Sequence, residues 1–118
     1  MQIEKLKNFV TECLNDSKAL DLVMIDVHEI TTLTDAMIIC TGRSSRHVTS
    51  IAQSLVTAAK KAKLSYINIE GEKEGEWVIV DLADIVIHIM QRETREFYNL
   101  EDLWEPVEQF RERRLKAK

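Results

Sequence analysis

The sequence predicts a single α/β (α+β) domain built on a mixed sheet of about five strands with flanking helices. Three observations lead to this class. Residues 36–41 form an unbroken apolar run, residues 77–90 hold two strand-like runs around a short turn, and residues 48–59 repeat apolar side chains at helical spacing. The first two patterns are typical of strands and the third of an amphipathic helix. A chain of 118 residues is large enough for one hydrophobic core and too small for two.

The start of the chain is expected to form a helix and then a strand. Apolar side chains recur at helical spacing from Ile3 to Cys13, and polar residues 15–17 end this predicted helix. Residues 20–27 predict a strand, and a threonine-rich connection follows over residues 28–34.

The middle of the chain contains the clearest strand and the clearest helix. The apolar run of residues 36–41 predicts an interior strand that is buried on both faces. Gly42 breaks this run, and either Ser44 or Ser45 can cap the helix that follows. The apolar stripe over residues 48–59 is the strongest periodic signal in the sequence and predicts that this helix packs on the sheet.

The last part of the chain supplies the remaining strands. Residues 66–69 predict a short third strand, residues 77–90 two more, and residues 93–104 short helical turns. A single domain is therefore expected over residues 1–106, followed by a basic tail over residues 107–118.

Charge is unevenly distributed along the chain. Residues 111–118 carry a net charge of +4, so residues 1–110 carry −8 within the total of −4. An acidic body repels nucleic-acid phosphates and favours a basic protein partner, although a negative charge that only confers solubility explains the same numbers.

Cys13 and Cys40 are too few for a zinc site or a disulfide framework, and no signal peptide is recognisable. A cytoplasmic location is therefore expected.

The predicted hairpin of residues 77–90 sorts its side chains onto two faces. If the strands pair about Leu82 and Ala83, period-two alternation gives an aliphatic core face of Val78, Val80, Ile85 and Ile87. The opposite face is mixed in chemistry and holds Trp77, Ile79, Asp81, Asp84, Val86, His88 and Met90. This second face is either a partner surface with an aromatic anchor or a face covered by a helix, with Trp77 in the core; the sequence leaves both open.

The sequence gives little support to catalysis. Nucleotidyl transfer needs closely spaced carboxylates for metal ions and a glycine–serine turn for the phosphates. The segment from Gly42 to Ser45 has the composition of such a turn, but Asp81 and Asp84 have an odd spacing, which separates strand carboxylates unless the turn brings them together. His47 is expected to be solvated, and the three histidines show no metal-ligand spacing. We therefore expect no enzymatic activity, no metal and no cofactor.

Two blocks of the sequence carry motifs in a specific order and spacing. The first block, residues 35–48, contains Cys40-Thr-Gly42 and Ser45-Arg-His47. The second block contains Glu70-Gly71, Trp77-Val-Ile-Val-Asp81, Asp84-Ile-Val-Ile-His88 and Phe97-Tyr-Asn-Leu-Glu-Asp-Leu-Trp104. Together they resemble the ribosomal silencing factor family (RsfS, or Iojap). Ala36 stands where that family usually has an aromatic residue, and Ala83 where it often has glycine.

This resemblance implies both a fold and a function. The implied fold has a nucleotidyltransferase-like core. The implied function is translational repression under nutrient limitation, by binding the large ribosomal subunit through a basic protein on its intersubunit face and blocking the joining of the small subunit. The residues expected to bind this partner are Trp77, Ile79, Asp81, Asp84, His88 and Met90, with Glu70 at the edge. Trp77 and Met90 would be the apolar anchors, and the carboxylates would pair with lysines or arginines.

Two other functions remain open from the sequence. A metal-dependent nucleotidyltransferase or phosphohydrolase of the same fold is the main alternative. A self-associating adaptor is the third, because an exposed apolar sheet face can also pair with itself. Away from the ribosome we expect a monomer or a weak homodimer, and from the basic tail at most a minor contact with rRNA.

Overall fold

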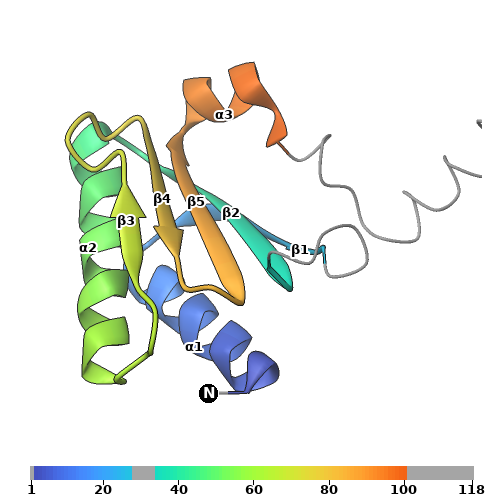
Figure 1. Ribbon diagram of the computed structural model, residues 1–118. Helices are drawn as coiled ribbons and strands as arrows, with labels where there is room; N and C mark the ends of the chain where they lie inside the picture. Colours follow the sequence, from blue (N-terminus) through green and yellow to red (C-terminus); the bar gives the residue numbers. More distant parts are fainter. Residues whose placement is uncertain (1, 28–33, 101–118) are drawn as a thin grey trace, which may run out of the picture.

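The computed structural model describes residues 2–27 and 34–100, and these form three helices and five strands (Figure 1). In chain order the elements are α1 (Ile3–Asp16), β1 (Leu20–Asp26), β2 (Ala36–Gly42), α2 (Ser45–Lys61), β3 (Asn68–Glu70), β4 (Trp77–Asp81), β5 (Ile85–Gln91) and α3 (Arg92–Tyr98). The predicted α+β class is confirmed. Most of the predicted threonine-rich connection, the end of the last helical segment and the basic tail lie outside the described residues. Within those residues, no helix is long and apolar enough to cross a membrane.

The five strands form one mixed sheet in the order β1-β2-β5-β4-β3. The pair β2–β5 is parallel, and the other three pairs are antiparallel. Every residue of β2 is buried, which confirms the interior strand that its unbroken apolar run predicts. Because β2 and β5 are parallel, the chain must cross over between them, and α2 lies within that crossover.

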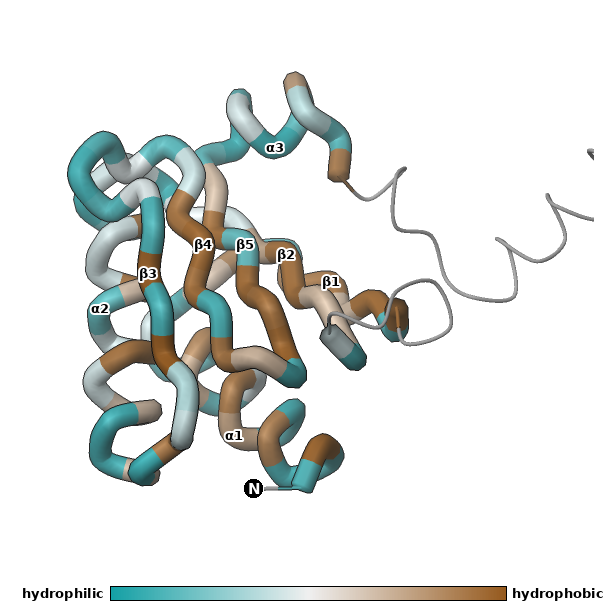
Figure 2. Tube along the Cα trace, in the orientation of Figure 1, coloured by the Kyte–Doolittle hydropathy of each residue, from teal (hydrophilic) through white to brown (hydrophobic). Residues whose placement is uncertain are grey.

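Helices α1 and α2 cover the same face of the sheet (Figure 1). The apolar stripe of α2 is buried there as predicted: Val48, Ile51, Ala52, Leu55 and Ala59. It packs with residues of α1 and of the sheet, namely Leu6, Val10, Leu14, Ile38, Cys40, Val78, Val80, Ile85, Ile87 and Ile89. Figure 2 shows the apolar residues concentrated on the strands and the inner sides of these helices. Full burial of each large aliphatic side chain contributes about 1.5–3 kcal/mol, so this layer is the main source of stability.

The start of α2 is fixed by a cap and by a close approach of the backbone. The Ser44 hydroxyl accepts a hydrogen bond from the backbone N–H of His47 at 3.1 Å, which makes Ser44 the N-cap. A Cβ atom on Gly42 would lie 2.6 Å from Cγ2 of Val48 and 2.9 Å from its backbone nitrogen. Only glycine therefore lets the strand pass this close to the helix.

The third strand is shorter and lies later in the chain than predicted. It covers Asn68–Glu70 rather than residues 66–69. The reason is the length of the neighbouring strand: Asn68 pairs with Asp81, and β4 ends there. The residues before Asn68 therefore have no strand beside them, and Tyr66 is exposed.

The β4–β5 hairpin turns one residue later than predicted. Trp77 pairs with Met90 and Asp81 with Val86, so the turn is centred between Ala83 and Asp84 rather than between Leu82 and Ala83. The pairing thus shifts by two positions, which leaves the strand residues on their predicted faces. The Asp81 Oδ1 atom accepts a hydrogen bond from the backbone N–H of Ala83 at 2.8 Å, as in an Asx turn. Ala83 has a φ of 69°, in the left-handed region that glycine adopts most easily.

We expect Ala83→Gly to raise the free energy of unfolding by about 0.5–1 kcal/mol. Removing the Cβ relieves the left-handed conformation, and this gain exceeds the added entropy of the unfolded chain. The control is Ala58→Gly, because Ala58 is helical in α2 and the same change there should lower the free energy by about 1 kcal/mol. Urea unfolding measures both, and a loss of stability in Ala83→Gly would contradict the strain argument.

Candidate partner-binding face

The face of the sheet opposite α1 and α2 carries the side chains of mixed chemistry that the hairpin pattern predicts. Strand register aligns them in rows that run across the sheet. One row reads Ile39, His88, Ile79 and Glu70, and the next reads Met37, Val86, Asp81 and Asn68. Trp77 and Met90 start a third row at the end nearest α3. We call the surface formed by Asn68, Glu70, Trp77, Ile79, Asp81, Val86, His88 and Met90 the mixed face.

Part of this side of the sheet is a second apolar cluster. Its buried members are Ile25, Val27, Met37, Ile39, Met90 and Leu100, and Val23 and Trp77 pack against them. Trp77 is half-buried at the border of this cluster. The sequence left open whether this face of the sheet is core or a partner surface. In the structure, the part of the face on β1 and β2 is core, and the part on β3 and β4 is partly exposed.

Trp77 and His88 form a hydrogen-bonded pair across the two strands. The indole Nε1–H of Trp77 donates to Nδ1 of His88 at 2.9 Å. An accepting Nδ1 places the histidine proton on Nε2. Burial lowers the pKa of His88 to about 4, because desolvation disfavours the charged ring. His88 is therefore neutral near pH 7 and is a satisfied sheet histidine that orients the Trp77 ring.

Two exposed aromatic residues of α3 continue from Trp77. The ring centroids of Trp77 and Tyr98 lie 4.8 Å apart, and those of Tyr98 and Phe97 lie 5.0 Å apart in an edge-to-face arrangement. Phe97 is 82% exposed and Tyr98 is 52% exposed. We call Trp77, Tyr98 and Phe97 the aromatic ladder.

Our sequence-based site did not include Phe97 or Tyr98. The available signal was a pair of adjacent aromatic residues in a segment with no apolar stripe to bury them, and α3 indeed has no buried residue. Aromatic side chains that a short helix leaves exposed beside a sheet face are typical of contact surfaces.

The structure places most of the predicted site residues on the mixed face, in different states of exposure. Glu70 is exposed on the edge strand, and its Oε1 atom accepts a hydrogen bond from the Asn68 side-chain amide at 3.4 Å. Ile79 and Asp81 are half-buried. Met90 is fully buried, so it supports Trp77 and offers no exposed anchor of its own.

Asp84 lies apart from these residues. It is exposed in the turn before β5 and lines a cavity of about 190 Å³ together with Leu6, Leu82 and residues 62–66. Leu6 and Leu82 belong to the core on the side of α1 and α2, so this cavity opens beside the helices. Parity arguments fail here because Asp84 belongs to a turn rather than to a strand.

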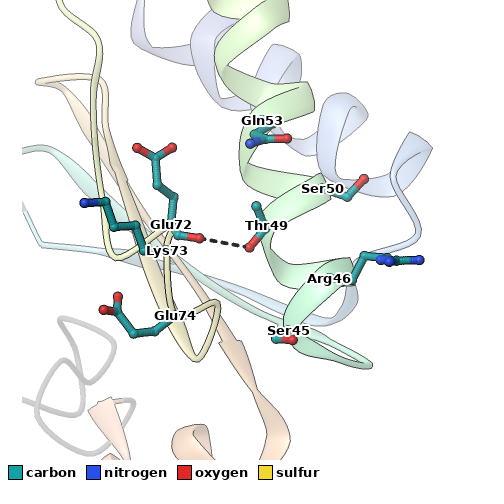
Figure 3. Close-up of a pocket in the computed structure, with 8 residues that line it drawn as sticks. All are labelled: Ser45, Arg46, Thr49, Ser50, Gln53, Glu72, Lys73 and Glu74. Atoms are coloured by element: carbon teal, nitrogen blue, oxygen red, sulfur yellow. Dashed lines mark hydrogen bonds between the residues drawn. The ribbon is translucent and has the colours of Figure 1, made fainter.

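A polar cavity of about 360 Å³ lies beside the predicted glycine–serine turn (Figure 3). Its walls are Ser45, Arg46, Thr49, Ser50 and Gln53 of α2 and residues Glu72, Lys73 and Glu74 of the β3–β4 loop. The Thr49 hydroxyl donates to the backbone oxygen of Glu72 at 3.2 Å, which ties the loop to the helix. Figure 3 shows the two glutamate carboxylates directed away from α2. Neither Asp81 nor Asp84 lines this cavity, and within residues 2–27 and 34–100 no three His, Cys, Asp or Glu side chains gather in a potential metal site.

His47 is not simply solvated, so that prediction was wrong. Its Nδ1 atom accepts a hydrogen bond from the backbone N–H of Arg43 at 2.9 Å, and its Nε2 atom lies 2.9 Å from the backbone oxygen of Ser17. The ring therefore joins the first turn of α2 to the end of α1. The contact with Ser17 spans 30 positions, so the helical pattern alone could not reveal it.

These features define a small α+β domain whose most distinctive surface is a group of exposed aromatic side chains beside a partly acidic sheet face. The whole chain, residues 1–118, matches the family model described as "Ribosomal silencing factor during starvation". It is 46% identical over 99 residues to Ribosomal silencing factor RsfS of Haemophilus influenzae, with 84% of this chain and 97% of that protein covered. The chain belongs to the ribosomal silencing factor family, as its motifs indicated.

Two further relatives extend the comparison. A crystal structure of a Chromobacterium violaceum protein matches with a TM-score of 0.86 and 36% identity, covering 90% of this chain and 88% of that one. The mouse protein named "Mitochondrial assembly of ribosomal large subunit protein 1" is 36% identical over 100 residues, which cover 82% of this chain and 44% of that protein. The likeness to nucleotidyltransferases stays a prediction.

We expect the stability of the protein to fall between about pH 6.5 and pH 4 partly because of His88. The folded state keeps the ring neutral to about pH 4, so over this interval only the unfolded chain takes up the proton, and lowering the pH favours unfolding. Over this range the protein should lose about 3 kcal/mol more than the variant His88→Gln, which keeps an acceptor but does not titrate. Urea unfolding at several pH values measures this difference, and parallel profiles would show that His88 is not held neutral.

Proposed function

We propose that this protein silences ribosomes by binding the large ribosomal subunit and blocking the joining of the small subunit when nutrients are scarce. The binding surface in this proposal is the exposed part of the mixed face together with the aromatic ladder. The observation that carries the proposal is the exposure of Phe97 and Tyr98, whose rings continue from the half-buried Trp77. Membership of the silencing factor family supports it, as does the name of the mouse relative, which refers to the large subunit.

The chemistry of the aromatic ladder suits a protein partner. Aromatic rings bury a large apolar area at a small cost in side-chain entropy, and tryptophan and tyrosine are enriched among residues that dominate binding energy. Tyr98 and Phe97 already contact each other edge-to-face in the free protein, so binding does not have to order them. Their exposed area would be removed from water only in a complex.

The charge of the surrounding surface indicates a basic partner. Glu70 and Asp81 lie on the mixed face, and residues 1–110 carry a net charge of −8. Opposite charge on a partner would speed association and fix its orientation. We therefore infer that the contact is made with a basic ribosomal protein at the intersubunit face, while residues 107–118 add at most a minor contact with rRNA.

The proposed mechanism is steric and needs no chemical step. A folded domain seated at the intersubunit face excludes the small subunit because two bodies cannot occupy the same volume. The catalytic alternative has less support: the Asp81 carboxylate is engaged with the Ala83 N–H, and Asp84 lies beside the helices. Saturable nucleotide binding in the presence of a divalent metal would favour that alternative. We infer a cytoplasmic site of action, as a monomer or a weak homodimer.

We expect the protein to sediment with isolated large ribosomal subunits and not with small ones. Phe97→Ala should weaken this binding about thirtyfold, the loss typical of an interface residue worth 2 kcal/mol. Its unfolding free energy should change little, because a side chain that is 82% exposed leaves no cavity. Tyr66→Ala is the matched control, since Tyr66 is also an exposed aromatic but lies beside the helices. Equal binding by both variants would remove the aromatic ladder from the site, and binding only to small subunits would reject the proposal.

The acidic part of the mixed face gives a separate prediction. Glu70→Lys should weaken binding to large subunits several-fold at low salt, because it places a like charge opposite a basic partner. The effect should shrink as salt is raised, since exposed charges are screened. Glu12→Lys makes the same charge change on α1, on the other side of the sheet, and should have little effect. If the two variants lost affinity equally, overall charge rather than a local contact would be responsible.

A further inference from the structure

Helix α3, which presents the aromatic ladder, has little apolar attachment of its own. It is seven residues long and none of its residues is buried. Helices this short are not stable in isolation, because the nucleating turn costs more than a few hydrogen bonds return. Figure 1 shows α3 at one end of the sheet, apart from α1 and α2. Something other than helix propensity or a buried stripe must therefore hold it in place.

Arg95 supplies a polar attachment from the middle of α3 to two strands. Its Nη1 atom donates to the backbone oxygen of Asp21 on β1 at 2.7 Å and to the hydroxyl of Thr41 on β2 at 2.9 Å. Thr41 is only 3% exposed and Arg95 is half-buried, so the contact between them is partly shielded from water. Hydrogen bonds from a charged donor are about twice as strong as those between neutral groups.

The backbone of β1 is distorted at the point where Arg95 binds. The β1–β2 register shifts between Leu20 and Val23, and Asp21 within this bulge has a φ of 49°. A bulge redirects backbone groups that would otherwise belong to the strand ladder. Left-handed backbone of this kind is costly for a residue other than glycine and persists only where surrounding contacts stabilise it. The Asp21 carbonyl directed at Arg95 is such a contact.

The end of α3 is fixed by a second contact. Asn99 adopts a φ of 49° and its N–H donates to the backbone oxygen of Arg95 at 2.9 Å, which closes the helix. Leu100 then enters the second apolar cluster and is buried. Tyr98 lies between these two attachments, at the position where its ring meets Trp77.

We propose that Arg95 is a positioning residue for partner binding. Its guanidinium fixes α3 against β1 and β2, and this keeps the Tyr98 ring in contact with Trp77 and leaves Phe97 exposed. A surface held in its bound geometry loses less entropy on association, so the attachment adds affinity without touching the partner. The role in binding rests on the proposed function, whereas the effect of Arg95 on the ladder does not.

The free protein tests the effect on the ladder. Trp104→Phe leaves Trp77 as the only tryptophan of the chain. In this background Arg95→Ala should change the emission of Trp77, because the Tyr98 ring is released from it. Arg92→Ala is the matched control: it removes the same charge one turn earlier on α3, from an exposed residue. Arg95→Lys should restore the signal in part, since it keeps the charge but not the planar fork. Identical spectra for the parent and Arg95→Ala would overturn the proposal.

Binding to large subunits tests the consequence through a mutant cycle. Arg95→Ala should weaken binding of the otherwise unmutated protein about tenfold, and less than twofold when Phe97 and Tyr98 are both already alanine. Equal losses in the two backgrounds would overturn the proposal, because Arg95 would then act on the partner or on general stability. Thr41→Val removes one acceptor of Arg95 and should weaken binding by a smaller factor, again only when Phe97 and Tyr98 are present. This variant replaces Arg95→Ala in the test if Arg95→Ala fails to fold. Failure of the unmutated protein to bind large subunits would reject the proposed function, and the fluorescence result would still decide whether Arg95 positions the ladder.

Discussion

The parallel pairing of β2 with β5 is the constraint on which the rest of this structure depends. β2 is buried along its whole length, and five of the seven residues of β5 are buried as well. Helices α1 and α2 pack on one side of this pair, and the second apolar cluster forms on the other. A proline in either strand would remove a hydrogen bond from the sheet on which both layers pack, and a charged side chain would be buried in whichever layer it faces.

The same pairing brings three segments together at one end of the strands: the start of α2, the start of α3 and the β3–β4 loop. Because the strands are parallel, Gly42 at the end of β2 lies opposite Gln91 at the end of β5. The chain continues from the first into α2 and from the second into α3. The Gln91 side-chain amide also donates to the backbone oxygen of Gly75 at 3.0 Å, which fixes the β3–β4 loop nearby. The aromatic ladder is thus built at the edge where parallel strands end, which is where α/β sheets commonly carry their sites.

The two sides of the sheet differ in composition. The side covered by α1 and α2 is aliphatic and stabilises the fold. The other side contains a polar pair, the half-buried Trp77 and the buried His88. Their hydrogen bond offsets the cost of burying the ring nitrogen of His88. The Trp77 ring contacts Tyr98, and Arg95 holds α3, the helix that carries Tyr98, against the sheet. The exposed aromatic rings of α3 therefore lie outside both apolar clusters, so truncating one of them should leave the packing of the core largely unchanged.

The sequence by itself determined the class of fold, the order of the elements and the face on which each strand residue of the hairpin lies. These follow from local periodicity, because alternation in a strand and the 3.6-residue repeat of a helix act between near neighbours. The tertiary structure decided which residues of the mixed face are exposed, that Asp84 lies beside the helices, and that Phe97 and Tyr98 extend from Trp77. It also decided the role of Arg95, whose acceptor on Asp21 is 74 positions away. Contacts over such separations depend on the order of strands in the sheet, and no local pattern of residues encodes that order.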